Sequence, residues 1–158
     1  MALKKRLVVS ALIPDRLGRI FVQKRTMTRR MFPGCWDLVG GRVEENEAAL
    51  SALEREIYEE TGWTLGEVVH ELTTKPWRDG PNEYEERQFI VNVDGDLQRP
   101  ALETSKVSGW MWVDRENEER LKENRMPGDH LIYKSVLEAL DVLDRRPPPD
   151  RGAESKSS

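Results

Sequence analysis

The sequence predicts a single α+β domain in which a mixed sheet lies between two helices. Residues 7–13 form a continuous apolar run that is typical of a buried strand, whereas residues 47–60 are rich in strong helix formers. Apolar side chains recur at helical spacing again in residues 130–143. A strand-rich middle between two amphipathic helices favours a helix–sheet–helix sandwich, which we expect to occupy residues 1–144.

Composition and charge exclude several classes of function. The 158 residues carry a net charge of −4, which argues against a general nucleic-acid binder but permits a local basic patch for a nucleotide. The single cysteine, Cys35, excludes an internal disulfide framework and fits a reducing cytoplasm. No apolar run approaches the roughly 20 residues of a membrane span. We therefore expect a cytoplasmic protein without a nucleic-acid or membrane partner, and a homodimer stays open.

The first strands are predicted to form a hairpin. Residues 7–13 would be its first strand and residues 14–18 its turn. Residues 19–25 alternate between apolar and polar side chains and should pair back antiparallel. Residues 31–39 then follow as a loop and a short strand.

The second half of the chain contains further strands and a short helix. Residues 67–74, 87–93 and 109–113 are expected to be strands, and residues 115–122 a charged helix. Residues 145–158 are rich in proline, charge and serine, so we expect a disordered C-terminal tail.

The stretch from Gly40 to Gly62 predicts a glycine turn followed by a helix. Asn46 is the expected N-cap, and Gly62 stands where a left-handed C-terminal residue is common. One stripe of this helix should face the core, because apolar residues recur there at helical spacing, namely Ala49, Leu50, Leu53 and Ile57.

Three glutamates cluster at the edge of that stripe. Glu56 and Glu60 lie one turn apart, with Glu59 beside them, and like charges at this spacing cost roughly 0.2–0.5 kcal/mol per pair. A hard divalent cation would offset this repulsion, because carboxylate oxygens suit Mg²⁺ or Mn²⁺. Zinc is disfavoured, since the chain has one cysteine and two separated histidines.

The segment from Gly41 to Trp63 resembles the Nudix box, written GX5EX7REUXEEXGU with U a bulky apolar residue. The matching positions are Gly41, Glu47, Arg55-Glu56-Ile57, Glu59-Glu60 and Gly62-Trp63. Tryptophan at the last position, which is usually aliphatic, is a mild departure. The resemblance implies the Nudix α/β/α sandwich with a mixed central sheet and a metal-dependent enzyme that hydrolyses a pyrophosphate.

The same resemblance implies roles for individual residues. Glu56, Glu59 and Glu60 would bind Mg²⁺ or Mn²⁺ together with the carbonyl of Gly40, and Glu56 would be a candidate base for the attacking water. Arg55 and Glu47 would form an ion pair that orients the site without touching the substrate.

Candidate substrate-binding residues lie on both sides of the box. Arg25 is favoured over Lys24, Arg29 and Arg30 as a diphosphate clamp, because guanidinium pairs bidentately with phosphate. Trp36 suits either core packing or stacking on a base.

Residues 75–86 read as a long polar loop after the box, with a mobile surface hairpin as the alternative. Its aromatic residues, Trp77 and Tyr84, are candidates for stacking on a base. A further metal ligand could come from Glu83, Glu85, Glu86 or the later Glu103.

We expect a nucleoside triphosphate or related nucleotide as substrate, because the signatures of other subfamilies are absent from the sequence. Three alternatives stay open at this point: an ADP-ribose or dinucleotide pyrophosphatase, an enzyme like the isopentenyl diphosphate isomerases that share the Nudix fold, and a non-catalytic nucleotide sensor.

Overall fold

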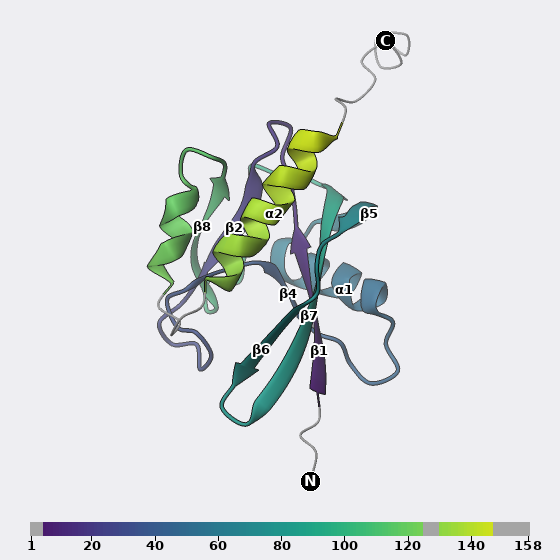
Figure 1. The fold of residues 1–158 in the computed structure, drawn as a ribbon, viewed down its shortest axis with the longest axis vertical. Helices are drawn as coiled ribbons and strands as arrows, with labels where there is room; N and C mark the ends of the chain where they lie inside the picture. The colour runs from purple at the N-terminus through teal and green to yellow at the C-terminus, as the bar shows by residue number, and fades with distance from the viewer. Residues whose placement is uncertain (1–4, 125–129, 147–158) are drawn as a thin grey trace.

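The computed structural model describes residues 5–124 and 130–146 (Figure 1). The elements follow in the order β1 (Lys5–Leu12), β2 (Ile20–Arg25), β3 (Trp36–Asp37), β4 (Val39–Arg42), α1 (Ala49–Thr61), β5 (Thr64–Glu71), β6 (Lys75–Asp79), β7 (Asn82–Asp94), β8 (Val107–Val113), the 3-10 helix η1 (Glu118–Glu123) and α2 (Leu131–Arg145). Most of the predicted tail, residues 147–158, lies outside the described part. None of the described helices is long and apolar enough to cross a membrane.

The strands form two sheets. The larger sheet has the order β4, β1, β7, β5, and β6 also pairs with β7. It is mixed, because β1 runs parallel to β7 and antiparallel to β4. The smaller sheet has the order β3, β2, β8 and is antiparallel. The predicted mixed sheet is therefore confirmed.

The predicted hairpin between residues 7–13 and 19–25 is wrong. The segments share no strand ladder: one backbone hydrogen bond runs from Phe21 N–H to the carbonyl of Ile13, next to an isolated bridge between Pro14 and Ile20. Strand β2 pairs instead with β3 and β8. Both edges of β1 are already occupied by β4 and β7, so no hydrogen-bonding edge remains for β2.

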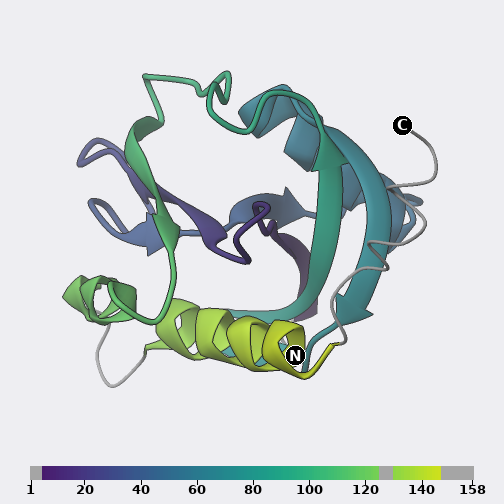
Figure 2. The same ribbon diagram turned by 90° about the horizontal axis from the view of Figure 1, so that it is seen from above.

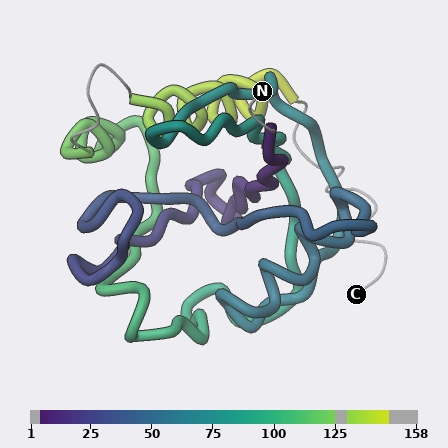
Figure 3. The backbone as a smooth tube through the Cα atoms, turned by 90° about the horizontal axis from the view of Figure 1, so that it is seen from below, coloured from purple at the N-terminus to yellow at the C-terminus, as the bar shows by residue number. Residues whose placement is uncertain are grey.

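Two apolar cores lie on opposite faces of the larger sheet, and a helix covers each of them (Figures 2 and 3). Val9 on β1 packs in the core that contains Leu53 and Ile57 of α1. Leu12, on the opposite face of β1, belongs to the core that contains Val136 of α2. This alternation follows from the two-residue period of a strand. The α/β/α sandwich is confirmed.

Helix α1 differs from the prediction at its start. It begins at Ala49, after an extended Ala48 that makes no side-chain cap bond. Asn46 is therefore not the N-cap; it has a left-handed φ of 65° in the preceding turn. Leu50 was expected in the core stripe but is 45% exposed, whereas Ala52 is fully buried. Gly62 ends the helix in the left-handed conformation, with φ 77°, as predicted.

Trp63 fits a position that is usually aliphatic because its surroundings leave room for the indole. The ring is 2% exposed and packs edge-on against Phe21 at 5.1 Å between centroids. Its Nε1 donates a hydrogen bond to the carbonyl of Asp96 at 2.9 Å. A Cβ on Gly95 would lie 2.6 Å from the indole, so glycine at that position provides the space.

Residues 75–86 form a regular β-hairpin, so the prediction of a long loop is wrong and the alternative of a hairpin is the one found. Strand β6 pairs antiparallel with the first half of β7, and Trp77 lies directly opposite Tyr84. This cross-strand aromatic pair stabilises a segment whose polar composition suggests a loop. Pro76 is tolerated because β6 is an edge strand. Its outer edge pairs with no other described strand, so the missing N–H of Pro76 costs no hydrogen bond there.

Candidate active site

Arg55 links the start of the box to the glutamates of α1. Its Nε and Nη2 donate to the two carboxylate oxygens of Glu47 at 2.9 and 3.0 Å, and Nη2 also donates to the carbonyl of Arg42. Its Nη1 lies 2.9 Å from Glu56 Oε1 and 3.4 Å from Glu59 Oε2. The guanidinium therefore pairs with Glu47, as the resemblance implied, and also holds the carboxylate of Glu56.

The hydrogen bonds from Arg55 lower the pKa of Glu47 from 4.5 to about 2. A carboxylate whose folded pKa is depressed stabilises the fold above its unfolded pKa, and this contribution is lost as the pH falls through the folded pKa. We therefore expect Glu47→Gln to destabilise the protein fully above about pH 5, with the difference from wild type shrinking between pH 4.5 and 2. Denaturant unfolding of both proteins across that range measures it; a constant difference would contradict the prediction.

Glu60 is the most enclosed of the three helix glutamates. Its Oε1 accepts a hydrogen bond from Gln23 Nε2 and its Oε2 accepts one from the backbone N–H of Gly40, both at 2.9 Å. Burial, followed by the negative charges of Glu56 and Asp37, raises the pKa of Glu60 well above its usual value. The fold thus holds a carboxylate where its ionised form is penalised, which is the condition that a bound cation would relieve.

The two glycines before the box helix are required by close contacts. A Cβ on Gly40 would lie 2.1 Å from the carbonyl oxygen of Val9, and one on Gly41 would lie 2.5 Å from the carboxylate of Glu56. The backbone and the carboxylate can approach so closely only because these residues lack side chains.

We expect Gly41→Ala to displace the Glu56 carboxylate and to lower activity at least tenfold while the protein still folds, because the clash is with the end of a side chain. Gly109→Ala is the matched control, since a Cβ at Gly109 meets no atom within 4 Å. Steady-state kinetics and thermal unfolding of both variants test this, and equal activity of the two would contradict it.

The three glutamates line one cavity of about 250 Å³, which we call the glutamate cavity. Its other lining residues are Arg29, Gly40, Gly41, Glu103, Lys106 and Val107. Glu103 is thus the one sequence-predicted extra ligand that lies here. Among the described residues, no three carboxylate, imidazole or thiol groups already converge on a single metal position. The Glu59 side chain is 55% exposed, which leaves it free to turn from Arg55 towards a cation.

A divalent metal fits this donor set. The cavity offers hard carboxylate oxygens, and the repulsion that raises the pKa of Glu60 is the kind that Mg²⁺ or Mn²⁺ offsets. The three helix glutamates and Gly40 all line this cavity.

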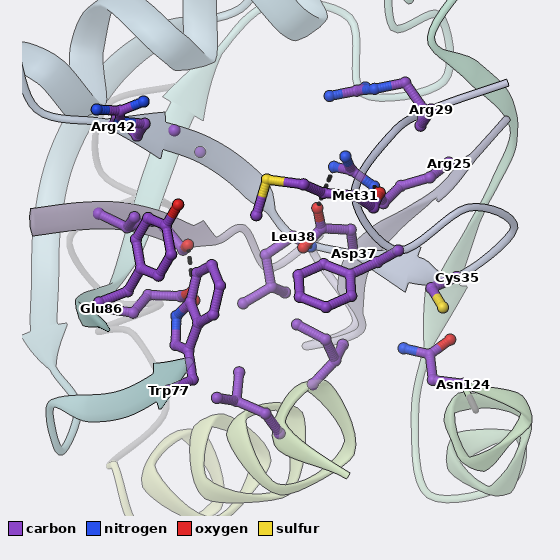
Figure 4. Close-up of a pocket in the computed structure, with 18 of the residues that line it drawn as sticks. Arg25, Arg29, Met31, Cys35, Asp37, Leu38, Arg42, Trp77, Glu86 and Asn124 are labelled. Carbon is purple, nitrogen blue, oxygen red and sulfur yellow. Dashed lines mark hydrogen bonds and ion pairs between the residues drawn. The ribbon is translucent and has the colours of Figure 1, made fainter. Parts of the chain in front are cut away.

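A second cavity of about 300 Å³ lies beside the first, and we call it the arginine–aromatic pocket. Arg29, Gly40 and Gly41 line both cavities. One wall is the face of the larger sheet that carries Arg6, Val8 and Ser10 of β1, next to Tyr84 and Glu86 of β7. Figure 4 shows Trp77 and Glu86 on one side of this pocket, facing Asp37, Leu38 and Cys35 on the other.

Five of the residues that line this pocket are arginines: Arg6, Arg25, Arg29, Arg30 and Arg42. Arg25, the predicted clamp, donates from Nε to the carbonyl of Met31 at 2.8 Å and from Nη1 to Asp37 at 3.0 Å. Its role towards phosphate stays a prediction, because these bonds occupy much of the guanidinium. Arg29 is better placed than the sequence suggested, since it alone of the five lines both cavities.

The predicted stacking residues lie together in the pocket. Trp77 and Tyr84 stack with ring centroids 4.0 Å apart and planes 12° apart, and Phe32 meets Trp77 edge-on at 5.7 Å. Tyr84 is 4% exposed, so Trp77 presents the more accessible ring. Phe32 carries no sequence signal for this role, and its backbone has a left-handed φ of 47°.

Trp36 belongs chiefly to the core. It is 5% exposed and packs with Leu38 and Leu121, although it also lines the pocket. Asn124 holds the backbone of Trp36, donating to its carbonyl at 2.8 Å and accepting from its N–H at 2.7 Å.

The other acidic candidates for metal ligands lie elsewhere. Glu83 pairs with Arg78, and Glu85 pairs with Lys5 on the opposite side of the strand from Glu86. Glu86 lines the arginine–aromatic pocket, not the glutamate cavity. Burial raises the pKa of Glu86, against the opposing effect of a hydrogen bond from Gln88.

The chain belongs to the Nudix family, because the NUDIX domain model matches residues 4–134. It is therefore a hydrolase of pyrophosphate bonds. It is 26% identical over 151 residues to an RNA pyrophosphohydrolase of Roseobacter denitrificans, covering 85% of this chain and 90% of that one. It is 29% identical over 125 residues to the nucleoside triphosphatase NudI of Escherichia coli O139:H28, covering 73% and 86%.

Solved structures agree with the fold. The MutT protein from Methanosarcina mazei Go1 superposes with a TM-score of 0.71 at 21% identity, covering 92% of this chain and 99% of that one. The MutT NUDIX hydrolase from Burkholderia pseudomallei superposes with a TM-score of 0.61 at 25% identity, covering 78% and 99%.

Proposed function

We propose that the protein is a metal-dependent pyrophosphohydrolase of nucleoside triphosphates or closely related nucleotides. The observation that carries this proposal is the junction of the two cavities, where Arg29, Gly40 and Gly41 line both. A phosphate chain lying at that junction has acidic metal ligands on one side, while the base reaches the aromatic side chains on the other.

Each group of residues in the two cavities has a separate role in the proposed reaction. Glu56, Glu59, Glu60 and the Gly40 carbonyl would hold the metal, which would supply neutralisation of the charge that develops on the phosphate oxygens. Arg29 lies where it can pair with the phosphate chain, and Arg55 keeps Glu56 in place. Water attacks a phosphorus, the P–O bond of the anhydride breaks, and a carboxylate of the glutamate cavity accepts the water proton.

The arginine set supports an anionic substrate. Among the described residues, Arg6, Arg29, Arg30 and Arg42 take part in no ion pair, although they line the pocket of a protein with a net negative charge. Unpaired arginines gathered around one pocket favour a ligand that carries several negative charges. The nucleoside triphosphatase NudI among the relatives supports a nucleotide. Cytoplasmic location and a homodimer stay predictions.

A substrate panel tests the proposal. Nucleoside triphosphates, ADP-ribose, dinucleoside polyphosphates, NADH and a 5′-triphosphorylated RNA are incubated with Mg²⁺ or Mn²⁺, and the loss of each substrate and the formation of its hydrolysis products are measured by chromatography. We expect the highest kcat/KM on a nucleoside triphosphate and no turnover after chelation of the metal. A clear preference for the RNA or for ADP-ribose would overturn the proposed substrate class.

Trp77→Ala should raise KM for the best nucleotide about tenfold to a hundredfold, because stacking of an aromatic ring on a base is worth about 1–3 kcal/mol. Trp77→Phe should recover most of this loss, and the Mg²⁺ dependence should not change. The matched control is Trp110→Ala, since Trp110 is 39% exposed and lies outside the pocket. An unchanged KM in Trp77→Ala would place base recognition elsewhere.

A further inference from the structure

A buried carboxyl group lies in the wall of the arginine–aromatic pocket without a basic partner. Glu86 is 6% exposed, and it takes part in no ion pair within the described part of the chain. Burying an unpaired acid opposes folding unless hydrogen bonds compensate for the lost water. A group held at such a cost beside a ligand pocket suggests a role in binding.

The hydrogen bonds to Glu86 leave one acceptor position open. Its Oε2 accepts from Ser10 Oγ at 2.8 Å and from Gln88 Nε2 at 2.6 Å, while its Oε1 accepts only from Trp77 Nε1 at 3.1 Å. A carboxylate offers about four lone-pair positions, two on each oxygen. Oε1 therefore keeps one position free at the side of Glu86 that adjoins the indole.

The neighbouring indole defines what can reach that position. Trp77 is covered on one face by Tyr84 and points its N–H edge at Glu86. Phe32 also contacts the indole, edge-on with the centroids 5.7 Å apart, so a base can stack on the face that Tyr84 leaves uncovered only when the Phe32 ring moves aside. A flat base in that place extends along the same edge of the indole, and its own edge comes next to Oε1. A hydrogen-bond donor on the edge of the base is the partner that an acceptor-only group requires.

We propose that Glu86 is a specificity-determining residue that accepts a hydrogen bond from an exocyclic amino group of the nucleobase. This inference rests on the proposed function as a nucleotide hydrolase. It deepens that function by selecting bases of the adenine, guanine or cytosine type over bases that present a carbonyl or a bare C–H at the same place. In this arrangement the positively charged arginines bind the phosphates, and the carboxylate of Glu86 binds the amino group of the base.

The competing explanation is that Glu86 only supports Trp77 and the sheet. Matched substrates separate the two roles, because a structural defect lowers kcat/KM for both members of a pair equally. Two pairs differ chiefly in one amino group: ATP with purine riboside triphosphate, and GTP with ITP. The readout is the kcat/KM ratio within each pair, measured with Mg²⁺ for wild type, Glu86→Leu, Glu86→Gln and Glu85→Gln.

In wild type we expect the amino-bearing member of the better-used pair to be preferred about tenfold to a hundredfold, the range for a hydrogen bond to a charged group. Glu86→Leu should bring this ratio to within about twofold. Glu86→Gln should give an intermediate ratio, because its amide oxygen still accepts a weaker bond and the unpartnered Gln88 Oε1 can receive its NH₂ group. Glu85→Gln makes the same chemical change on the opposite side of β7 and should leave the ratio unchanged.

Two results would overturn this inference and leave the proposed function intact. They are an equal kcat/KM of wild type for both members of each pair, or a kcat/KM ratio that is unchanged in both Glu86 variants. If Glu86→Leu does not fold, the ratio in Glu86→Gln decides. Failure to hydrolyse any triphosphate with either metal is a different result, since it rejects the proposed function and this inference with it.

Discussion

Glu60→Gln is expected to lower kcat at least a hundredfold while the fold keeps or gains stability. The carboxylate is needed to hold the metal, so its loss removes charge stabilisation from the reaction. The apo protein, by contrast, loses a buried charge that repels Glu56 and Asp37. The amide can be accommodated, because Gln23 Oε1 has no hydrogen-bond partner and can accept from the new NH₂ group after a flip of the Gln23 side chain.

Glu54→Gln is the matched control for that experiment. Glu54 lies on the exposed face of the same helix, so its neutralisation should change neither kcat nor stability measurably. Activity assays and denaturant unfolding of both variants, with and without Mg²⁺, give the two readouts. Full activity in Glu60→Gln would remove this residue from the mechanism.

Arg55→Ala is expected to impair both folding and catalysis. The guanidinium makes two hydrogen bonds to Glu47 and one to Glu56, and charge-assisted bonds of this kind contribute about 1.5–3 kcal/mol each when buried. Since the Arg55 side chain is 26% exposed, we expect a total loss of about 2 kcal/mol in the free energy of unfolding. The rate should fall because Glu56 is no longer held.

Arg87→Ala is the control for this second change. Arg87 also makes a two-pronged pair, with Glu71, but both partners are more than a third exposed. Its removal should change stability by less than about 1 kcal/mol and leave activity intact. If Arg55→Ala kept native stability but bound substrate more weakly, Arg55 would contact the substrate and the orienting role would be rejected.

Helix α1 and its glutamates could be predicted from neighbouring residues in the sequence, whereas the pairing of the strands could not. The spacing of Glu56, Glu59 and Glu60 on a helix follows from neighbouring residues alone. The strands that pair with β1 are β4 and β7, which are distant in sequence. The local sequence pattern therefore could not exclude a hairpin between β1 and residues 19–25. The predicted helix start was wrong for a related reason, because Glu47 takes part in the turn before the helix, where it exchanges hydrogen bonds with Glu44, and also pairs with the distant Arg55.

The substrate side of the site was predictable only in part. Trp77 and Tyr84 were identified by residue type, although the hairpin that places them was predicted only as the alternative to a loop. Arg29 and Glu86 gain their significance from burial and from the cavities they line, neither of which a sequence pattern reveals. The alternation of Tyr84, Glu86 and Gln88 along one strand face was the signal that could have found Glu86, had β7 been recognised to begin at Asn82.

The two faces of strand β1 serve different parts of the site. Its odd-numbered residue Val9 supports the helix that carries the glutamates, whereas its even-numbered residues Arg6, Val8 and Ser10 face the arginine–aromatic pocket. We expect a substitution at Arg6, Val8 or Ser10 to alter what the pocket accepts without disturbing the packing of α1. Libraries that vary only these positions and their β7 neighbours Tyr84 and Glu86 should therefore yield enzymes with new substrate preferences and an unchanged metal requirement.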